Sequence, residues 1–294
     1  MNNLTLKQLR YFESLARQRH FGRAAADCSI SQPALSMQIK ELEELLGSPL
    51  LEKSVRPLRL TAFGEQFSSQ SSEILRAVKN LGEFAQAARG RPIGTLRIGV
   101  IPTVAPYVLP TMINDLAVNF PELEIKFKET VTANLIKDIL EGSLDTALVA
   151  LPVSEPGLSE YPLFSEDFSF VRPKKDAHKP VPKPEILREM RLLLLEEGHC
   201  FRDQALAFCK TASAPPRDMM SGSSLSTLVQ MVSAGIGVTL IPEMALAVEQ
   251  RSASVAVAAF DPPRPSRTIG MIWRKKNPLK DHFEQISKFI RKPT

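Results

Sequence analysis

The sequence changes character at one point, and this change limits the folds that are open to the chain. Up to residue 88, apolar residues recur at helical spacing, whereas from residue 95 short strand-like segments alternate with helical ones. Between them, Arg89-Gly90-Arg91-Pro92 contains two residue types that interrupt helices, which predicts a domain boundary. A length of 294 residues and a hydrophobic content of 44% are enough for two or three packed domains.

Composition and the cysteine count favour a globular protein of the cell interior. The start of the chain lacks a basic stretch followed by an apolar run, and no segment of about 18 apolar residues is available to span a bilayer. Three cysteines cannot form a disulfide framework, and no Cys and His spacing suits zinc. We therefore expect a cytoplasmic protein with no metal, cofactor or membrane partner. A formal charge of +5 permits a nucleic-acid partner without requiring one.

The first 64 residues predict a small helical domain. Apolar residues from Leu6 to Ala16 share one helix face, and a second short helix covers Arg23–Ala26. Ser31 begins a third helix as its cap, with Pro33 in the first turn. In a helix-turn-helix, the polar edge of this third helix would face a major groove. Periodicity alone favours an ordinary amphipathic bundle.

Two further elements follow these helices. Residues 47–60 predict a turn and a β-hairpin, along which Lys53, Arg56 and Arg59 are placed to contact phosphates. Beyond the hairpin, residues spaced by alternating steps of four and three predict a helix that pairs with a second copy of the chain; they are Phe67, Ser71, Ile74, Val78, Leu81, Ala85 and Ala88. The alternative is a single helix that packs on its own domain.

The rest of the chain predicts an α/β fold with a mostly parallel sheet. Strands and helices alternate from Thr95 to Leu151, and a second unit of this kind covers roughly residues 166–267. Such sheets bind ligands beyond the carboxyl ends of their strands, where Thr103 and Thr132 are located. A threonine at a strand end is more often only a turn or cap residue.

Residues 198–209 hold two of the three cysteines in the chain. Residues 191–195 predict a buried strand and residues 201–208 a short helix, so that Cys200 lies at a helix N-terminus. The helix dipole at this end favours an anion, and His199 and Arg202 add neighbouring positive or polarisable groups. The sequence thus favours the thiolate form of Cys200.

A thiolate attacks peroxides and becomes a sulfenic acid, which condenses with a second thiol. Cys209 is the only nearby candidate for that thiol. The residues alone fit two structural cysteines equally well. Cys28 has apolar neighbours and no basic cluster beside it, which predicts a packed small hydrophobe.

Two of these segments resemble the LysR-type transcriptional regulators. Phe21-Gly22-Arg23-Ala24-Ala25-Ala26, followed by Ser31-Gln32-Pro33-Ala34-Leu35-Ser36, is similar to the winged helix-turn-helix of that family. Gly198-His199-Cys200-Phe201-Arg202-Asp203-Gln204-Ala205-Leu206-Ala207-Phe208-Cys209 resembles the redox segment of its peroxide-sensing members. The chain departs from the family at Thr61-Ala62-Phe63-Gly64, where Thr-x-Ala-Gly is usual, and at Lys53, where Arg is common.

The resemblance implies an α+β multidomain fold. It consists of a winged helix-turn-helix in residues 1–64, a linker (dimerisation) helix in 65–90, and a two-lobed α/β regulatory domain in 91–294 that resembles periplasmic binding proteins. Lobe I would cover about 91–165 and 268–294, and lobe II about 166–267. Besides the basic hairpin residues, the DNA contacts that the resemblance implies are Arg23, Ser31, Gln32, Pro33 and Ser36.

The resemblance also implies a mechanism. Hydrogen peroxide oxidises Cys200, and a disulfide with Cys209 changes the subunit arrangement of a homotetramer that activates transcription of oxidative-stress genes through RNA polymerase. Such a protein is a regulator and not an enzyme. The residues that would surround Cys200 and hold peroxide are Thr103, Thr132, His199, Asp203 and Arg267.

Two other functions fit parts of the same sequence. A LysR-type regulator could sense a small organic effector in the cleft between the lobes. A thiol enzyme, such as a peroxidase or a cysteine hydrolase, could use Cys200 with His199. Adjacent residues form a poor nucleophile and base pair, because a side chain rarely points back at its neighbour.

Overall fold

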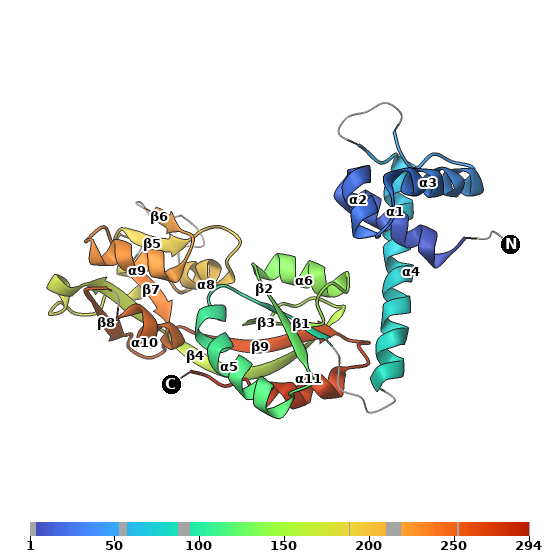
Figure 1. Cartoon of the computed structure of the whole chain (residues 1–294). Coiled ribbons are helices and arrows are strands. Elements are labelled where there is room, and N and C mark those ends of the chain that lie inside the picture. Colours follow the sequence, from blue (N-terminus) through green and yellow to red (C-terminus); the bar gives the residue numbers. More distant parts are fainter. Residues whose placement is uncertain are drawn as a thin grey trace. The chain divides into compact units, whose positions relative to one another are not determined.

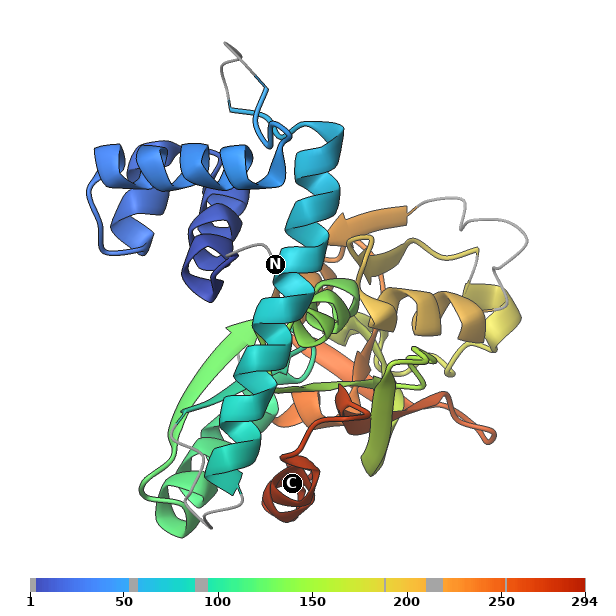
Figure 2. The same ribbon diagram turned by 90° about the vertical axis from the view of Figure 1, so that its right-hand side faces the viewer.

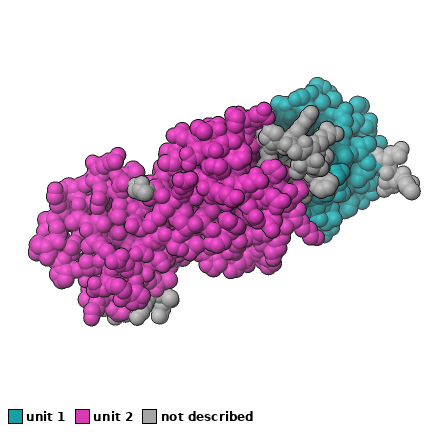
Figure 3. All heavy atoms as spheres, turned by 90° about the horizontal axis from the view of Figure 1, so that it is seen from below, with its two compact units in different colours: residues 1–88 teal, residues 89–294 magenta. Residues whose placement is uncertain are grey.

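The computed structural model describes residues 4–52, 58–87, 95–187, 189–209, 219–251 and 253–293. The chain forms two compact units, Met1–Ala88 and Arg89–Thr294 (Figure 3). Within the described residues, no helix combines the length and the apolar character that crossing a bilayer would require.

The first unit consists of helices. The first three gather around one end of the fourth (Figures 1 and 2); they are α1 (Leu6–Gln18), α2 (Phe21–Asp27), α3 (Gln32–Leu46) and α4 (Ala62–Ala87). Side chains fix their beginnings, because Thr5 and Gln8 form a reciprocal capping box on α1, and Ser31 accepts the backbone N–H of Ala34 on α3. The predicted cap at Ser31 and the early proline are confirmed.

Helix α4 divides its apolar residues between two environments. Phe67 lies beside Phe12, with ring centroids 5.5 Å apart, and the Ser71 side chain is buried. Farther along, Ile74 is 45% exposed and Leu81 is 67% exposed. The first half of α4 therefore packs on its own unit, whereas the second half presents apolar residues that this unit leaves uncovered. The helix begins at residue 62, three residues before the predicted start.

The second unit contains a mixed sheet that extends through two lobes (Figure 1). In the first lobe, β1 is parallel to β2 and to β3. The strands and helices of this lobe are β1 (Thr95–Val100), α5 (Ala105–Asn119), β2 (Glu124–Glu129), α6 (Thr132–Leu140), β3 (Thr146–Leu151) and α11 (Lys280–Ser287).

Two long strands connect the lobes. Residues 158–167 of β4 (Leu158–Pro173) pair with β9 (Ser266–Arg274), and its last six residues pair with two strands of the second lobe. The elements of the second lobe are η1 (Lys174–Asp176), α7 (Pro184–Leu187), β5 (Leu192–Leu195), α8 (Cys200–Phe208), β6 (Met219–Gly222), α9 (Leu225–Ser233), β7 (Thr239–Pro242), η2 (Glu243–Ala245), α10 (Leu246–Glu249) and β8 (Val255–Ala259).

The prediction of a mostly parallel sheet is wrong. Strands β4 and β9 run antiparallel to each of their partners, because each passes directly from one lobe to the other without a crossover helix. Helix α5 begins at residue 105 and contains Pro110.

Two glycines of α4 give opposite predictions for the same substitution. A Cβ atom at Gly64 would overlap the carbonyl oxygen of Leu50, whereas a Cβ atom at Gly82 would meet nothing within 4 Å. We expect Gly64→Ala to lower the free energy of unfolding of the first unit by about 1–3 kcal/mol, because the Leu50 backbone must shift. Gly82→Ala should raise it by roughly 0.5–1 kcal/mol, because alanine is the better helix former.

Urea unfolding followed by far-ultraviolet circular dichroism measures both changes. Equal losses of stability in the two variants would contradict the close approach of Leu50 to α4.

Candidate functional site

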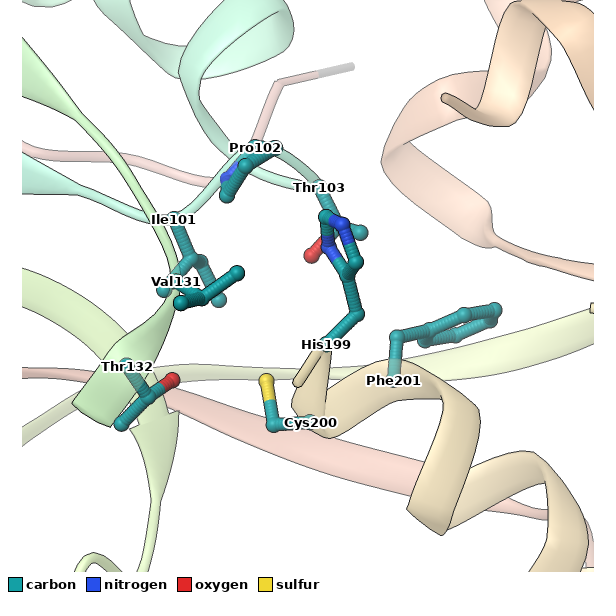
Figure 4. A pocket seen from close by; sticks show the side chains of 8 residues that line it. All are labelled: Ile101, Pro102, Thr103, Val131, Thr132, His199, Cys200 and Phe201. Carbon is teal, nitrogen blue, oxygen red and sulfur yellow. The ribbon is translucent and has the colours of Figure 1, made fainter. Parts of the chain in front are cut away.

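A narrow pocket in the second unit contains Cys200 (Figure 4). Three segments that are distant in sequence form it: the turn after β1, the turn between β2 and α6, and the start of α8. The pocket is small. The lining residues are Ile101, Pro102, Thr103, Val131, Thr132, His199, Cys200 and Phe201.

Three helices begin at or next to this pocket. Thr132 is the first residue of α6, Cys200 is the first residue of α8, and Thr103 lies two residues before α5. No side chain caps any of these three helices. Their first backbone N–H groups and the positive ends of their dipoles therefore suit an anion, which is the form in which a thiol reacts.

The Thr132 hydroxyl has no hydrogen-bond partner among the described residues, although the oxygen atom is buried. It points into the pocket, on the side where the Cys200 sulfur lies (Figure 4). A buried hydroxyl without a partner is costly to a folded protein. A small polar molecule between Thr132 and Cys200 would satisfy it.

Thr103 is held from behind by a buried arginine. Arg267 donates through Nη1 to Thr103 Oγ1 at 2.8 Å and through Nη2 to the Thr103 carbonyl at 3.1 Å. Its Nε donates to Glu166 Oε1 at 2.8 Å, and both charged side chains are completely buried. Arg267 therefore reaches the pocket through Thr103 and through the Phe201 ring, whose centroid lies 5.2 Å from the guanidinium carbon.

His199 lines the pocket as a half-buried side chain. Burial lowers the pKa of His199, and the nearby Glu196 carboxylate opposes this only in part. At neutral pH the imidazole is therefore uncharged. The positive charge that the sequence suggested beside Cys200 does not come from this residue.

Two predicted neighbours of Cys200 lie elsewhere. Asp203 is exposed on α8 and does not line the pocket, because the helix turns the face that carries Phe201 and Ala205 into the lobe. Arg202 is buried, and its guanidinium donates to the carbonyl of Leu195 at 3.0 Å. It thus fixes α8 on β5 rather than lining the pocket.

Cys209 ends α8 and is fully buried. Burial raises the pKa of the Cys209 thiol to about 11, so this thiol is protonated and shielded in the present state. All three cysteines are free thiols, and Cys28 is half-buried in the first unit. Within the described residues, no group of three or more His, Cys, Asp or Glu side chains could hold a metal ion.

Glu166 was missed by sequence reasoning. It lies in β4, directly opposite Arg267 in the register of β4 and β9. A register between strands 101 residues apart leaves no local signal in the sequence. Strand β4 also carries Glu160 and Asp167, so the presence of an acidic residue in it does not single out Glu166.

Every predicted DNA-contact residue that the structure describes is exposed, whereas Leu35, Ile39 and Leu42 of α3 are buried against the other helices. The exposed residues are Arg23, Ser31, Gln32, Pro33, Ser36 and Arg59. The predicted hairpin is described only at its base, where Leu51 and Leu60 form an antiparallel bridge. Lys53 and Arg56 lie outside the described residues.

Comparison with known proteins gives matches over nearly the whole chain. A probable hydrogen peroxide-inducible genes activator of Streptomyces viridosporus is 41% identical over 292 residues, which cover 98% of this chain and 93% of that protein. The DNA-binding transcriptional dual regulator OxyR of Escherichia coli K12 is 39% identical over 291 residues, which cover 98% of this chain and 95% of that protein.

Solved structures give the same result. Full-length OxyR from Pseudomonas aeruginosa aligns with a TM-score of 0.78 at 35% identity, covering 98% of this chain and 95% of that one. A hydrogen peroxide-bound mutant of Corynebacterium glutamicum OxyR aligns with a TM-score of 0.66 at 36% identity, covering 97% and 91%.

Two family models match in the order of the two units. Residues 6–65 match the bacterial regulatory helix-turn-helix protein of the lysR family. Residues 89–292 match the LysR substrate binding domain. The chain belongs to the LysR family of helix-turn-helix transcriptional regulators.

Proposed function

We propose that this protein is a DNA-binding transcriptional regulator that senses hydrogen peroxide through Cys200. The observation that carries the proposal is the pocket itself, in which a cysteine at a helix N-terminus faces the unpartnered Thr132 hydroxyl. The matched relatives are named as hydrogen peroxide-inducible activators, which supports the same function.

The pocket residues suit the oxidation of a thiolate by peroxide. The Cys200 thiolate attacks one peroxide oxygen, an S–O bond forms, and the O–O bond breaks. Sulfur loses two electrons and the peroxide gains them. The departing hydroxide takes up the proton that the Cys200 thiol had released to solvent on forming the thiolate, and it leaves as water. Hydroxyl groups of Thr103 and Thr132 hold the peroxide, while neutral His199 can donate or accept one hydrogen bond.

The second step joins Cys200 to Cys209. The sulfenic acid of Cys200 is attacked by the Cys209 thiol, a disulfide forms, and one water molecule leaves. Cys209 must first leave its buried position, since nine residue steps of an α-helix separate its Cα atom from that of Cys200 by roughly 13 Å. A disulfide tolerates at most about 7 Å. Oxidation therefore requires α8 to unfold.

The pocket favours peroxide over an organic effector, because it joins a cysteine at a helix N-terminus with two threonine hydroxyls, which suit the oxidation of a thiol. The alternative of a thiol enzyme lacks a suitable base, because His199 is adjacent to Cys200 in the chain. A thiol enzyme must also cycle rapidly between its oxidised and reduced forms. Here each cycle through the Cys200–Cys209 disulfide would require α8 to open, because Cys209 is buried.

We place the DNA-reading domain in residues 1–64, the linker helix in 65–90 and the sensor in 91–294. Lobe I takes about 91–165 and 268–294, and lobe II about 166–267. The exposed Ile74 and Leu81 of α4 support pairing with a second copy, and two such pairs would give a homotetramer. Activation would proceed through contact with RNA polymerase at the promoter.

A footprint before and after oxidation tests the proposed function. A DNA duplex is selected from a random pool with the reduced full-length protein, and one equivalent of hydrogen peroxide is then added. We expect the DNase I footprint to change, and dithiothreitol to restore it. Cys200→Ser should give the reduced footprint under both conditions, whereas Cys28→Ala, the matched control, should respond like the wild type.

A wild-type footprint that peroxide leaves unchanged would exclude the proposed function. Rapid consumption of many equivalents of peroxide in the presence of dithiothreitol would instead indicate a thiol peroxidase.

Gln32, at the start of α3, and Arg59, at the base of the predicted hairpin, should affect DNA binding in different ways. Gln32→Ala should relax sequence choice by about 1–3 kcal/mol at one base pair, because an amide can read a base edge. Arg59→Ala should weaken binding to every sequence and reduce the salt slope by about one phosphate contact. Fluorescence anisotropy with the selected and a scrambled duplex at several salt concentrations measures both. If both variants lost specific and nonspecific binding equally, this division of roles would be wrong.

A further inference from the structure

We propose that Glu166 is a positioning residue for the reaction of Cys200 with peroxide, and that it acts through Arg267 on the hydroxyl of Thr103. The inference rests on the proposed function and adds a residue that lies outside the pocket. Its basis is a continuous chain of buried polar contacts from Glu166 to the pocket.

The first contact is the ion pair at the junction of the lobes. Glu166 and Arg267 face each other on β4 and β9, the strands that connect the lobes. Glu166 Oε1 accepts from Arg267 Nε at 2.8 Å, while its Oε2 accepts the backbone N–H of Met244 at 3.0 Å. The carboxylate therefore anchors the arginine to η2 of the second lobe. Each oxygen has its own donor.

The second contact fixes the hydroxyl of Thr103. Arg267 uses its two terminal nitrogens on the side chain and the carbonyl of the same threonine. A hydroxyl that accepts from a guanidinium keeps its single proton for another acceptor. Within the described part of the chain, Thr103 donates this proton to no protein group. The proton is therefore available to the pocket that Thr103 lines.

This arrangement matters for the oxygen that departs from the peroxide. As the O–O bond breaks, negative charge grows on the leaving oxygen, and a donor already held in place stabilises it. The positive guanidinium behind the hydroxyl strengthens that donor. A reagent whose leaving group accepts hydrogen bonds poorly gains far less from Thr103. Iodoacetamide, which releases iodide, is such a reagent.

Glu166→Gln disturbs this chain without changing the size of the side chain. An amide offers one acceptor oxygen where the carboxylate offers two, so its NH₂ group must face either Met244 N–H or Arg267 Nε–H. Arg267 also loses its counter-charge inside the protein. We expect the guanidinium to shift and the Thr103 hydroxyl to lose its fixed direction.

The test compares two reactions of the Cys200 thiol in the full-length protein with Cys209→Ser, where oxidation stops at the sulfenic acid. Rates with hydrogen peroxide and with iodoacetamide are measured by mass spectrometry of the Cys200 peptide, the sulfenic acid being trapped with dimedone. Glu166→Gln should lower the ratio of the peroxide rate to the iodoacetamide rate by about tenfold or more. Thr103→Val should lower it at least as far.

The double variant Glu166→Gln/Thr103→Val should then be no slower with peroxide than Thr103→Val alone, because both changes remove the same donor. Tyr107→Phe is the matched control. Its hydroxyl donates to Glu249 Oε1 at 2.8 Å, which is another buried hydrogen bond between the lobes, and this bond does not involve Thr103, Arg267 or Glu166. Its rate ratio should equal that of the starting protein.

Three outcomes would overturn the inference: an unchanged ratio in Glu166→Gln, an equal loss in Tyr107→Phe, or additive losses in the double variant. Circular dichroism checks that each variant is folded. If Glu166→Gln fails to fold, Glu166→Gln/Arg267→Met removes both charges together, and its ratio should fall to that of Thr103→Val. Failure of the starting protein to form any sulfenic acid would refute the proposed function itself, before Glu166 is considered.

Discussion

A nine-residue helix and a disulfide between its first residue and the residue after its last cannot exist at the same time. Cys200 begins α8 and Cys209 follows its last residue, so the helix holds the two sulfur atoms apart in the reduced state. The same helix places Cys200 in the pocket and buries Cys209 in the second lobe. The pocket and the buried thiol thus both depend on α8 remaining folded.

The packing of α8 determines what its unfolding would release. Phe201 lies against Phe168, with ring centroids 4.8 Å apart, and Phe208 lies against Phe260 at the same separation. Withdrawing one buried phenylalanine from its contacts costs about 1.5–3 kcal/mol. The free energy of disulfide formation must offset this cost. Withdrawal of the rings would also expose the surfaces that they had covered. A segment with two packed arrangements of this kind can transmit one covalent change to a subunit interface.

Phe201 also connects the helix to the buried charges. The Arg267 guanidinium carbon lies 5.2 Å from the centre of its ring, and Arg267 holds Thr103. Displacement of Phe201 would therefore remove the contact between its ring and the Arg267 guanidinium. In the proposed mechanism, the disulfide would thus alter the groups that assist oxidation of Cys200, which suits a sensor that reacts once and then stays changed.

The sequence predicted those features that depend on neighbouring residues. The cap at Ser31 and the helix that starts beside Cys200 follow from local patterns, and both are present. The convergence of Thr103 and Thr132 on Cys200 was implied only by family resemblance, since 97 residues separate Thr103 from Cys200. Glu166 and the exposed position of Asp203 could not be predicted, because strand register and the rotation of α8 are set by tertiary packing. The antiparallel course of β4 was missed for the same reason.

Hydrogen exchange of the reduced and the peroxide-oxidised protein tests the central claim most directly, provided that disulfide mapping has shown the Cys200–Cys209 bond in the oxidised sample. In the reduced protein, the α8 amides should be protected, including that of Cys209, which donates to the Ala205 carbonyl at 3.1 Å. After oxidation, residues 201–209 should exchange rapidly, while α9 in the same lobe keeps its protection. A mapped Cys200–Cys209 disulfide with unchanged protection across α8 would contradict the account.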